Sequence, residues 1–171
     1  MKLNVIDGKN KKFIRSKNYN YNFDKNTGYF ERWGSSYNDD PLFSPGPEIL
    51  DIEISAGKCI ASCPFCYKAN AGGLDEIHMT FDEYKSIIDK TPPTLMQVAL
   101  GLTDTDSNPD FIKILEYTRS KGIIPNYTCN GQRLTDEVID ATVKNCGAVA
   151  VSVGSGNKST VKKYYRRKKK I

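Results

Sequence analysis

Three cysteines close together in the chain are the residues best suited to chemistry. Cys59, Cys63 and Cys66 are spaced four and three residues apart, and Gly57 and Pro64 can bend the segment that carries them. All three thiols can therefore reach one inorganic centre. A closed zinc site normally has four ligands, and the sequence has no second Cys-x-x-Cys pair or paired histidine here. An iron–sulfur cubane usually takes four cysteines, so three would leave one iron open to another ligand.

The remaining candidate ligands are isolated in the sequence. His78 is the only histidine and precedes a predicted helix, so we interpret it as a solvated flank rather than a ligand. Cys129 and Cys146 lie far from the other three cysteines, and we interpret both as small packing residues. Five cysteines without an export signal favour metal or redox chemistry over a disulfide framework, because the cytosol keeps thiols reduced.

An alternation of strands and helices is predicted from residue 48 onward. Apolar runs predict strands at residues 49–54, 95–100, 123–128 and 148–153. The second to fourth strands follow one another at the spacing of βαβ units, about 30 residues each. The interval between the first and second strands is longer, because the loop within it carries the cysteines. Parallel strands with right-handed helical crossovers place the loops after the strands on one edge, where such folds hold their sites.

Capping residues predict three helices between these strands. Thr80 and Glu83 form a capping box that starts the first helix. Asn108 is expected to cap the second helix, with Pro109 at its first position. Thr135 is expected to cap the third. These helices are the elements that must hold the strands, and with them the cysteine loop, in place.

The first 47 residues differ in composition from the rest and are predicted to form an extension. Tyr19, Tyr21 and Phe23 alternate with Asn, and the turn-forming residues 24–28 separate them from a second aromatic stretch. This pattern predicts a β-hairpin. Prolines within residues 38–47 predict an extended linker, because proline lacks an N–H donor and disfavours helix before it.

The cysteine motif carries a family resemblance. A Cys-x-x-x-Cys-x-x-Cys loop after the first strand of a repeating β/α chain, with aromatic Phe65 before the last cysteine, resembles the radical S-adenosylmethionine (radical SAM) superfamily. The resemblance implies that Cys59, Cys63 and Cys66 hold a 4Fe-4S cluster and that the open iron binds S-adenosylmethionine. It implies cleavage of that molecule to a 5′-deoxyadenosyl radical, which abstracts hydrogen from a substrate. It also implies an electron donor such as flavodoxin or ferredoxin.

Further residues are assigned to S-adenosylmethionine binding by the same resemblance. The family has a Gly-Gly-Glu element after its second strand, and here the place holds Gly101, Leu102, Thr103 and Asp104. Only Gly101 clearly matches, and Asp104 is the candidate for the missing carboxylate. Ser152, at the end of the fourth strand, resembles a family serine near the S-adenosylmethionine ribose or carboxylate. Asn130 follows the third strand and is expected to line the site. The substrate and any catalytic side chain are not legible from the sequence.

The fold class predicted from these patterns is α/β, a partial (β/α) barrel of the radical SAM type. About four β/α units are expected, with an N-terminal β-hairpin extension. The expected divisions are 1–47 for the extension and linker, 48–157 for the partial core and 158–171 for a basic tail. The family core has six β/α units, so the sequence favours a chain truncated after the fourth strand. Such a chain is expected to be weakly stable, with little turnover and an open edge that recruits a partner chain.

The tail leaves alternative functions open. Residues 162–171 hold seven of the 25 basic residues and no acidic residue, which leaves 18 basic and 20 acidic residues in the rest of the chain. The net charge of +5 therefore belongs to the tail. One alternative is an iron–sulfur or zinc binding module whose tail binds nucleic acid. Another is an inactive truncated fragment.

Composition excludes several broad classes of protein. Hydrophobic residues at 39% and charged residues at 26% lie near globular averages, which excludes wholesale disorder. No run of about 18 apolar residues exists, and no apolar segment near the start matches a secretory signal. A cytoplasmic protein of 171 residues, one domain with extensions, is the expectation.

Overall fold

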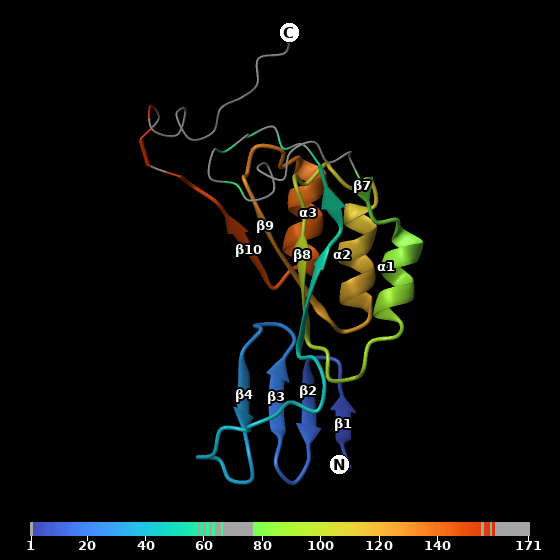
Figure 1. The fold of residues 1–171 in the computed structure, drawn as a ribbon, viewed down its shortest axis with the longest axis vertical. Helices are drawn as coiled ribbons and strands as arrows, with labels where there is room; N and C mark the ends of the chain where they lie inside the picture. Colours follow the sequence, from blue (N-terminus) through green and yellow to red (C-terminus); the bar gives the residue numbers. More distant parts are fainter. Residues whose placement is uncertain are drawn as a thin grey trace.

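The computed structural model describes residues 2–57, 59, 61, 63, 66, 77–154, 156, 157 and 159. Phe65, predicted to belong to the cysteine motif, and nearly all of the basic tail lie outside the described residues. Two sheets dominate this part of the chain, one antiparallel and one parallel (Figure 1).

The antiparallel sheet is formed by the first 33 residues and has the strand order β1-β2-β3-β4. Its strands are β1 (Asn4–Asp7), β2 (Lys11–Arg15), β3 (Asn20–Asp24) and β4 (Phe30–Trp33). The predicted hairpin is present as β3 and β4, which pair Asn20 with Trp33 and Phe23 with Phe30. Sequence reasoning missed β1 and β2, so the extension is a four-stranded sheet rather than a hairpin alone.

The parallel sheet has the order β10-β9-β8-β5, and its strands pair in parallel as the β/α pattern predicted. The strands are β5 (Ile49–Glu53), β8 (Gln97–Gly101), β9 (Ile124–Cys129) and β10 (Ala148–Val151). The chain is therefore α/β, with a parallel sheet. Within the described residues these strands form an open sheet, in which β5 and β10 are the outer strands.

Three helices cover one face of the parallel sheet (Figure 1). They are α1 (Phe81–Ile88), α2 (Phe111–Ser120) and α3 (Asp136–Asn145). Their apolar sides and the sheet share one core, which contains Tyr84, Ile114, Leu115, Val98 and Leu100. The opposite face of the sheet is left without a helix layer in the described part of the chain.

Local capping explains two of the three helix starts. The Thr80 side chain accepts a hydrogen bond from the Glu83 N–H while the Glu83 carboxylate accepts one from Thr80 N–H, so the predicted capping box is confirmed. Thr135 caps α3 by accepting a hydrogen bond from Val138 N–H, also as predicted. A positive φ of 72° at Gly122 follows the end of α2.

The predicted start of α2 is wrong by two residues. Asp110, not Asn108, is the N-cap residue, and the helix begins at Phe111. Asn108 is buried, and its amide nitrogen donates to the carbonyl oxygens of Ile54 (2.8 Å) and Met79 (2.9 Å). Asn108 Oδ1 accepts the Asp110 N–H at 2.8 Å, a local contact at the start of the helix, while its amide nitrogen binds these two carbonyls far away in the chain.

The antiparallel sheet packs against the amino ends of the parallel strands. Ile14, Tyr21 and Phe23 share a buried cluster with Met96 and Ile124, which precede or begin β8 and β9. The buried Lys12 ammonium donates to the Leu95 carbonyl oxygen at 3.1 Å. The two sheets are therefore held end to end by one small core and a buried hydrogen bond.

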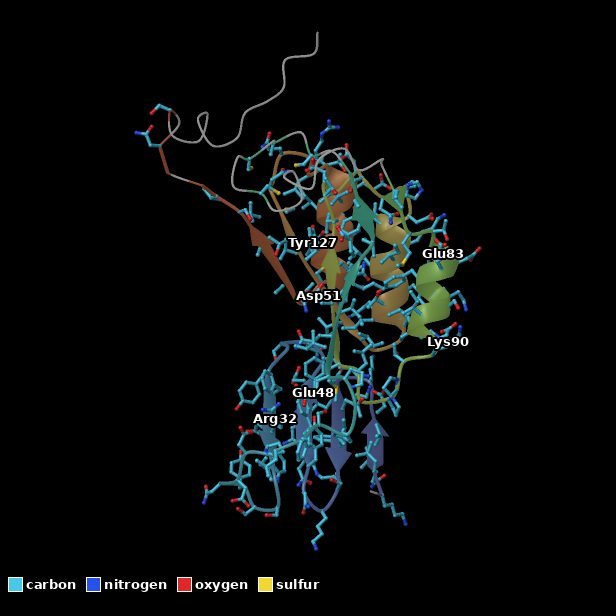
Figure 2. The ribbon with its side chains drawn as sticks, viewed as in Figure 1. Arg32, Glu48, Asp51, Glu83, Lys90 and Tyr127 are labelled. Atoms are coloured by element: carbon cyan, nitrogen blue, oxygen red, sulfur yellow. The ribbon has the colours of Figure 1, made fainter. Side chains whose placement is uncertain are left out.

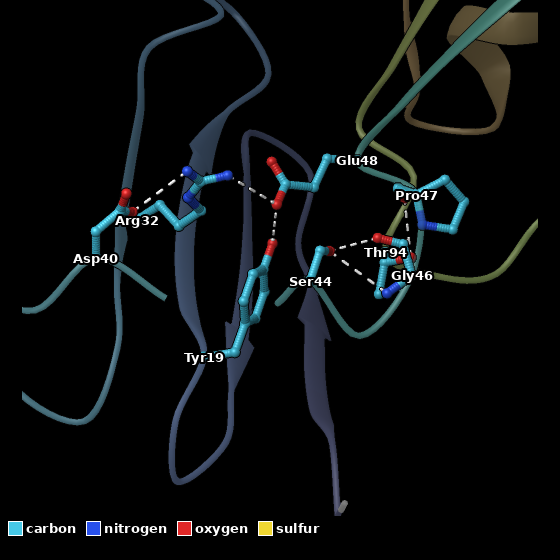
Figure 3. A network of polar contacts seen from close by, with 8 residues as sticks. All are labelled: Tyr19, Arg32, Asp40, Ser44, Gly46, Pro47, Glu48 and Thr94. Carbon is cyan, nitrogen blue, oxygen red and sulfur yellow. Dashed lines mark hydrogen bonds and ion pairs between the residues drawn. The ribbon is translucent and has the colours of Figure 1, made fainter. Parts of the chain in front are cut away.

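Glu48 joins the two sheets at this junction (Figure 3). Its carboxylate accepts a hydrogen bond from the Tyr19 hydroxyl at 2.6 Å and pairs with Arg32 at 3.4 Å. Its backbone carbonyl accepts the Met96 N–H at 2.8 Å, directly before β8. Burial, with the Glu48 contact, raises the pKa of Tyr19, so this hydroxyl remains a donor. Glu48 thus ties Tyr19, just before β3, and Arg32 on β4 to the start of the parallel sheet.

Helices in the described part of the chain are at most ten residues long. None of them is long and apolar enough to cross a membrane.

Candidate functional site

A pocket of about 670 Å³ opens at the carboxyl ends of the parallel strands. Its described lining brings together three of the sequence motifs, the cysteine loop after β5, the loop after β8 and the loop after β9. The lining includes Cys59, Cys63, Cys66, Gly101, Asn130 and Ser152. This is the edge at which α/β proteins place their ligands.

The base of the cysteine loop is closed by a short antiparallel ribbon. In it β6 (Ser55–Ala56) pairs with β7 (Ile77–His78), with Ser55 opposite His78. The loop therefore leaves and returns to the sheet at one place. Asn108 strengthens this closure, because its amide bridges the carbonyl oxygens of Ile54 and Met79, one residue beyond each end of the ribbon. His78 is exposed in this ribbon.

The cysteine loop is also joined to the loop after β8. The hydroxyls of Ser55 and Ser107 lie 2.6 Å apart, and Ser55 Oγ accepts the Thr103 N–H at 3.1 Å. Ser107 Oγ in turn donates to the Asp104 carbonyl at 2.6 Å. Two small hydroxyl residues thus fix the position of Asp104 relative to the start of the cysteine loop.

The three predicted cysteines line the same pocket and are each partly buried. The Cys66 N–H donates to the Cys63 carbonyl at 3.1 Å, so these two lie in one turn. Cys59 Sγ lies 3.4 Å from an Asp104 carboxylate oxygen and accepts from the Ala61 N–H at 3.4 Å. Among the described residues no group of three or more His, Cys, Asp or Glu side chains is arranged as a metal-ligand set.

Burial raises the pKa of both Cys59 and Cys63. The nearby Asp104 carboxylate contributes to the rise at Cys59, and Cys66 contributes at Cys63. Metal ligation needs thiolates, so binding of a metal centre here must release protons. The donor set fits a thiophilic centre: three thiols, carried by one short segment, open onto one cavity.

Asp104 and Asn130 form a polar pair beside Cys59. The Asn130 amide nitrogen donates to Asp104 Oδ1 at 2.5 Å and to Cys59 Sγ at 3.4 Å. Asp104 is buried, with 4% of its surface exposed. The loops after β5, β8 and β9 therefore meet through three side chains at one corner of the pocket.

Small residues keep the floor of the pocket open. Ala99 and Gly101 lie on β8, and Ala148 and Ala150 lie on β10. A Cβ on Gly101 would meet Glu53 Cα at 3.2 Å, which makes glycine the residue that fits between β8 and β5 at this point. These four positions leave space on the sheet face that has no helix layer.

Polar groups complete the floor further from the cysteines. Asp51 lines the pocket from β5, beside Ala99 in the register of the sheet, and is labelled in Figure 2. On β9, Asn126 donates to Gln97 Oε1 and accepts the Ala148 N–H, both at 2.9 Å, so this amide holds the start of β10. The floor thus combines a structural amide with an exposed carboxylate.

A family model described as the radical SAM superfamily matches residues 54–171. The match covers more than two thirds of the chain and includes all three cysteines and every strand that borders the pocket except β5. This chain belongs to the radical SAM superfamily. Members of this superfamily typically use a 4Fe-4S cluster and S-adenosylmethionine, so membership agrees with the chemistry of the three thiols.

Two curated proteins that match part of this radical SAM chain are named ATP synthase gamma chains. Over 86 residues it is 35% identical to an ATP synthase gamma chain of Frankia casuarinae. The matched segment is 50% of this chain and 28% of that protein. Over 76 residues it is 28% identical to an ATP synthase gamma chain of Cutibacterium acnes. That match covers 44% of this chain and 22% of that protein. The chain spans less than a third of either relative. So short a match brings no activity to this chain.

The other residues predicted for cofactor binding lie around the same pocket of this radical SAM protein. Gly101 and Ser152 line it directly, and the Ser152 N–H donates to the Cys129 carbonyl at 2.9 Å. Asp104 lies behind the pocket lining, where it contacts two lining residues, Cys59 and Asn130. Phe65 lies outside the described residues, so its predicted place is not described.

The two remaining cysteines pack in the interior. Cys129 is 6% exposed and belongs to the main core, although it also borders the pocket. Cys146 packs against that core, and burial raises its pKa to about 12. Sequence reasoning missed Ser55 and assigned Asn108 only as a helix cap, because their bridging contacts join residues 29 to 54 positions apart. The local signals were the place of Ser55 just after β5 and the place of Asn108 just before α2.

Proposed function

We propose that this chain binds a 4Fe-4S cluster and S-adenosylmethionine at the carboxyl edge of its parallel sheet. Cys59, Cys63 and Cys66 would be the cluster ligands. The observation that supports this most is the shared pocket, onto which all three thiols open in a chain of the radical SAM superfamily. When bound, the cluster supplies the electron that cleaves S-adenosylmethionine to methionine and a 5′-deoxyadenosyl radical, which abstracts hydrogen from a substrate.

The residues around the cysteines would hold the ligand set in position. The β6–β7 ribbon and the Asn108 bridge fix both ends of the cysteine loop. Ser55 and Ser107 fix the neighbouring loop against it. A ligand set of this kind costs less conformational entropy to assemble, because its supports are already in place before the cluster binds.

S-adenosylmethionine would lie over the small residues of the floor. Gly101 leaves room for close approach of the ligand to the strand, since a Cβ there would lie only 3.2 Å from Glu53 Cα on β5. Asp104 would accept a hydrogen bond from the cationic amino group, and Ser152 would contact the ribose or carboxylate. We assign the four β/α strands to a partial barrel, with the uncovered sheet face as its inner face.

An assay for S-adenosylmethionine cleavage tests this function. The chain is reconstituted with iron and sulfide without oxygen, reduced, and given S-adenosylmethionine, and methionine and 5′-deoxyadenosine are quantified. The Cys59→Ala, Cys63→Ala and Cys66→Ala variants should each lose product formation, because each removes one thiolate. Cys146→Ala is the matched control, since this thiol packs against the core outside the described pocket lining.

Product formed equally by all three variants would contradict the assignment of the cluster ligands. No product from a wild-type chain that carries the cluster would contradict the cleavage reaction for this chain.

A further inference from the structure

Asn130 is placed where the loops after β5, β8 and β9 meet, and its amide group is oriented by the backbone. Its Oδ1 accepts the Gln132 N–H at 2.8 Å, in a turn where Gly131 has a φ of 73°. That contact identifies which end of the amide is oxygen. The nitrogen end must therefore face the other way, toward Asp104 and Cys59.

Both hydrogens of this nitrogen have a partner. One is directed to Asp104 Oδ1 at 2.5 Å and the other to Cys59 Sγ at 3.4 Å. The other Asp104 oxygen, Oδ2, accepts a hydrogen bond from the Cys59 thiol at 3.4 Å. Three side chains from three loops thus form a closed triangle, in which Asn130 is the donor to both neighbours.

We propose that Asn130 is a positioning residue that sets the reduction potential of the cluster. The proposal rests on the proposed function, since Cys59 must be a cluster ligand. An N–H group directed at a ligating sulfur stabilises the additional negative charge of the reduced cluster, which raises its potential. The hydrogen bond from Asn130 also offsets part of the electrostatic effect of the Asp104 carboxylate on that sulfur. Both effects make reduction easier.

Two substitutions separate this role from the structural role of the turn. Asn130→Ser keeps an oxygen that can accept the Gln132 N–H but is too short to reach Cys59, and it adds no charge. Asn130→Asp has nearly the same shape and keeps the acceptor oxygen, but places a carboxylate where the donor stood. Asn126→Ser is the control on β9, the strand that leads to Asn130, because the Asn126 amide binds Gln97 and the Ala148 N–H instead of Cys59.

The experiment is a redox titration of the reconstituted full chain, followed by electron paramagnetic resonance, with iron content measured for every variant. We expect a more negative midpoint potential for Asn130→Ser than for the wild type, and a still more negative one for Asn130→Asp. Asn126→Ser should keep the wild-type potential, although it should lower stability.

Unchanged potentials in both Asn130 variants with the cluster loaded would overturn this proposal and leave the proposed function standing. A wild-type chain that binds no cluster after reconstitution would instead overturn the proposed function, and this proposal with it. A potential that shifts equally in Asn126→Ser would also overturn it, because the effect would then not depend on contact with Cys59.

Discussion

At their amino ends, β8 and β9 meet an aromatic sheet that closes around Met96 and Ile124, whereas at their carboxyl ends polar loops surround an open pocket. The first region buries Tyr21 and Phe23 almost completely. The second keeps Cys59, Cys63 and Cys66 only partly buried. The same strands therefore have a stabilising end and a reactive end. Substitutions at the amino end should therefore change stability, and those at the carboxyl end should change cluster or ligand binding.

The largest effect is expected from removing an aromatic ring at the stabilising end. Phe23→Ala should lower the free energy of unfolding by about 3–5 kcal/mol, because the Phe23 side chain is 1% exposed and its loss leaves a cavity. Urea denaturation followed by circular dichroism measures this. The matched control is Phe43→Ala, a side chain 82% exposed, which should change stability by less than about 0.5 kcal/mol.

At 4 °C in stabilising buffer, folded Phe23→Ala should still take up iron as the wild type does. Loss of the cluster from correctly folded Phe23→Ala would show that the two ends of the strands do not act independently.

The next effect in size belongs to the reactive end. Asp104→Asn should weaken S-adenosylmethionine binding roughly 10- to 100-fold, because a hydrogen bond to a charged group contributes about 1.5–3 kcal/mol. Binding is followed by the change in the electron paramagnetic resonance spectrum of the reduced cluster as ligand is added.

Asp106→Asn is the control on the same loop, because Asp106 is exposed and pairs with Arg133 rather than with Cys59. Equal weakening by both substitutions would show that the loop, not the Asp104 carboxylate, matters for binding.

A smaller effect is expected at the junction between the two sheets. Tyr19→Phe removes the buried hydroxyl that donates to Glu48 at 2.6 Å, and should cost about 1.5 kcal/mol of unfolding free energy. Arg32 still pairs with Glu48, which limits the loss. Tyr37→Phe removes a hydroxyl that donates to Glu31 at the surface and should cost far less. Similar losses from the two variants would contradict a stabilising role for the junction.

The smallest effect on stability is expected at Asp89, an exposed carboxylate at the C-terminal end of α1. Contacts of Asp89 with Lys121, Lys85 and Tyr117 hold its pKa well below its usual value of 3.8. A carboxyl with a lowered folded-state pKa adds stability above its unfolded-state pKa and loses that contribution as the pH falls. Asp89→Asn should therefore be slightly less stable than the wild type at pH 7, with the difference shrinking toward pH 2.

Urea denaturation at both pH values measures this difference, and Lys90→Gln, a neighbouring exposed charge, is the control. A stability difference that grows on acidification would contradict a lowered pKa for Asp89 in the folded state.

Much of the fold was predictable because its signals are local. The capping box of Thr80 and Glu83 and the cap at Thr135 depend on residues three positions apart, and both are confirmed. The apolar runs predicted all four parallel strands to within a few residues. Asn108 was misassigned because its partners, Ile54 and Met79, are 54 and 29 residues away.

The first two strands escaped prediction for a related reason. Lysines interrupt the apolar pattern of Lys11–Arg15, yet Lys12 is buried because its ammonium reaches the Leu95 carbonyl 83 residues away. The spacing of Cys59, Cys63 and Cys66 alone predicted that they lie together, and they line one pocket. Contacts of Asn130 with Asp104 and Cys59 were not, because they exist only when three loops meet.

Iron and sulfide analysis of the reconstituted chain measures whether Cys59, Cys63 and Cys66 hold a 4Fe-4S cluster. After anaerobic reconstitution, the wild type should hold about four irons and four sulfides, with the absorption and paramagnetic signals of a 4Fe-4S cluster. Replacing Cys59, Cys63 and Cys66 together by Ala should abolish them, while Cys146→Ala should retain them. Zinc bound in place of iron, or a cluster that survives the triple replacement, would contradict the account.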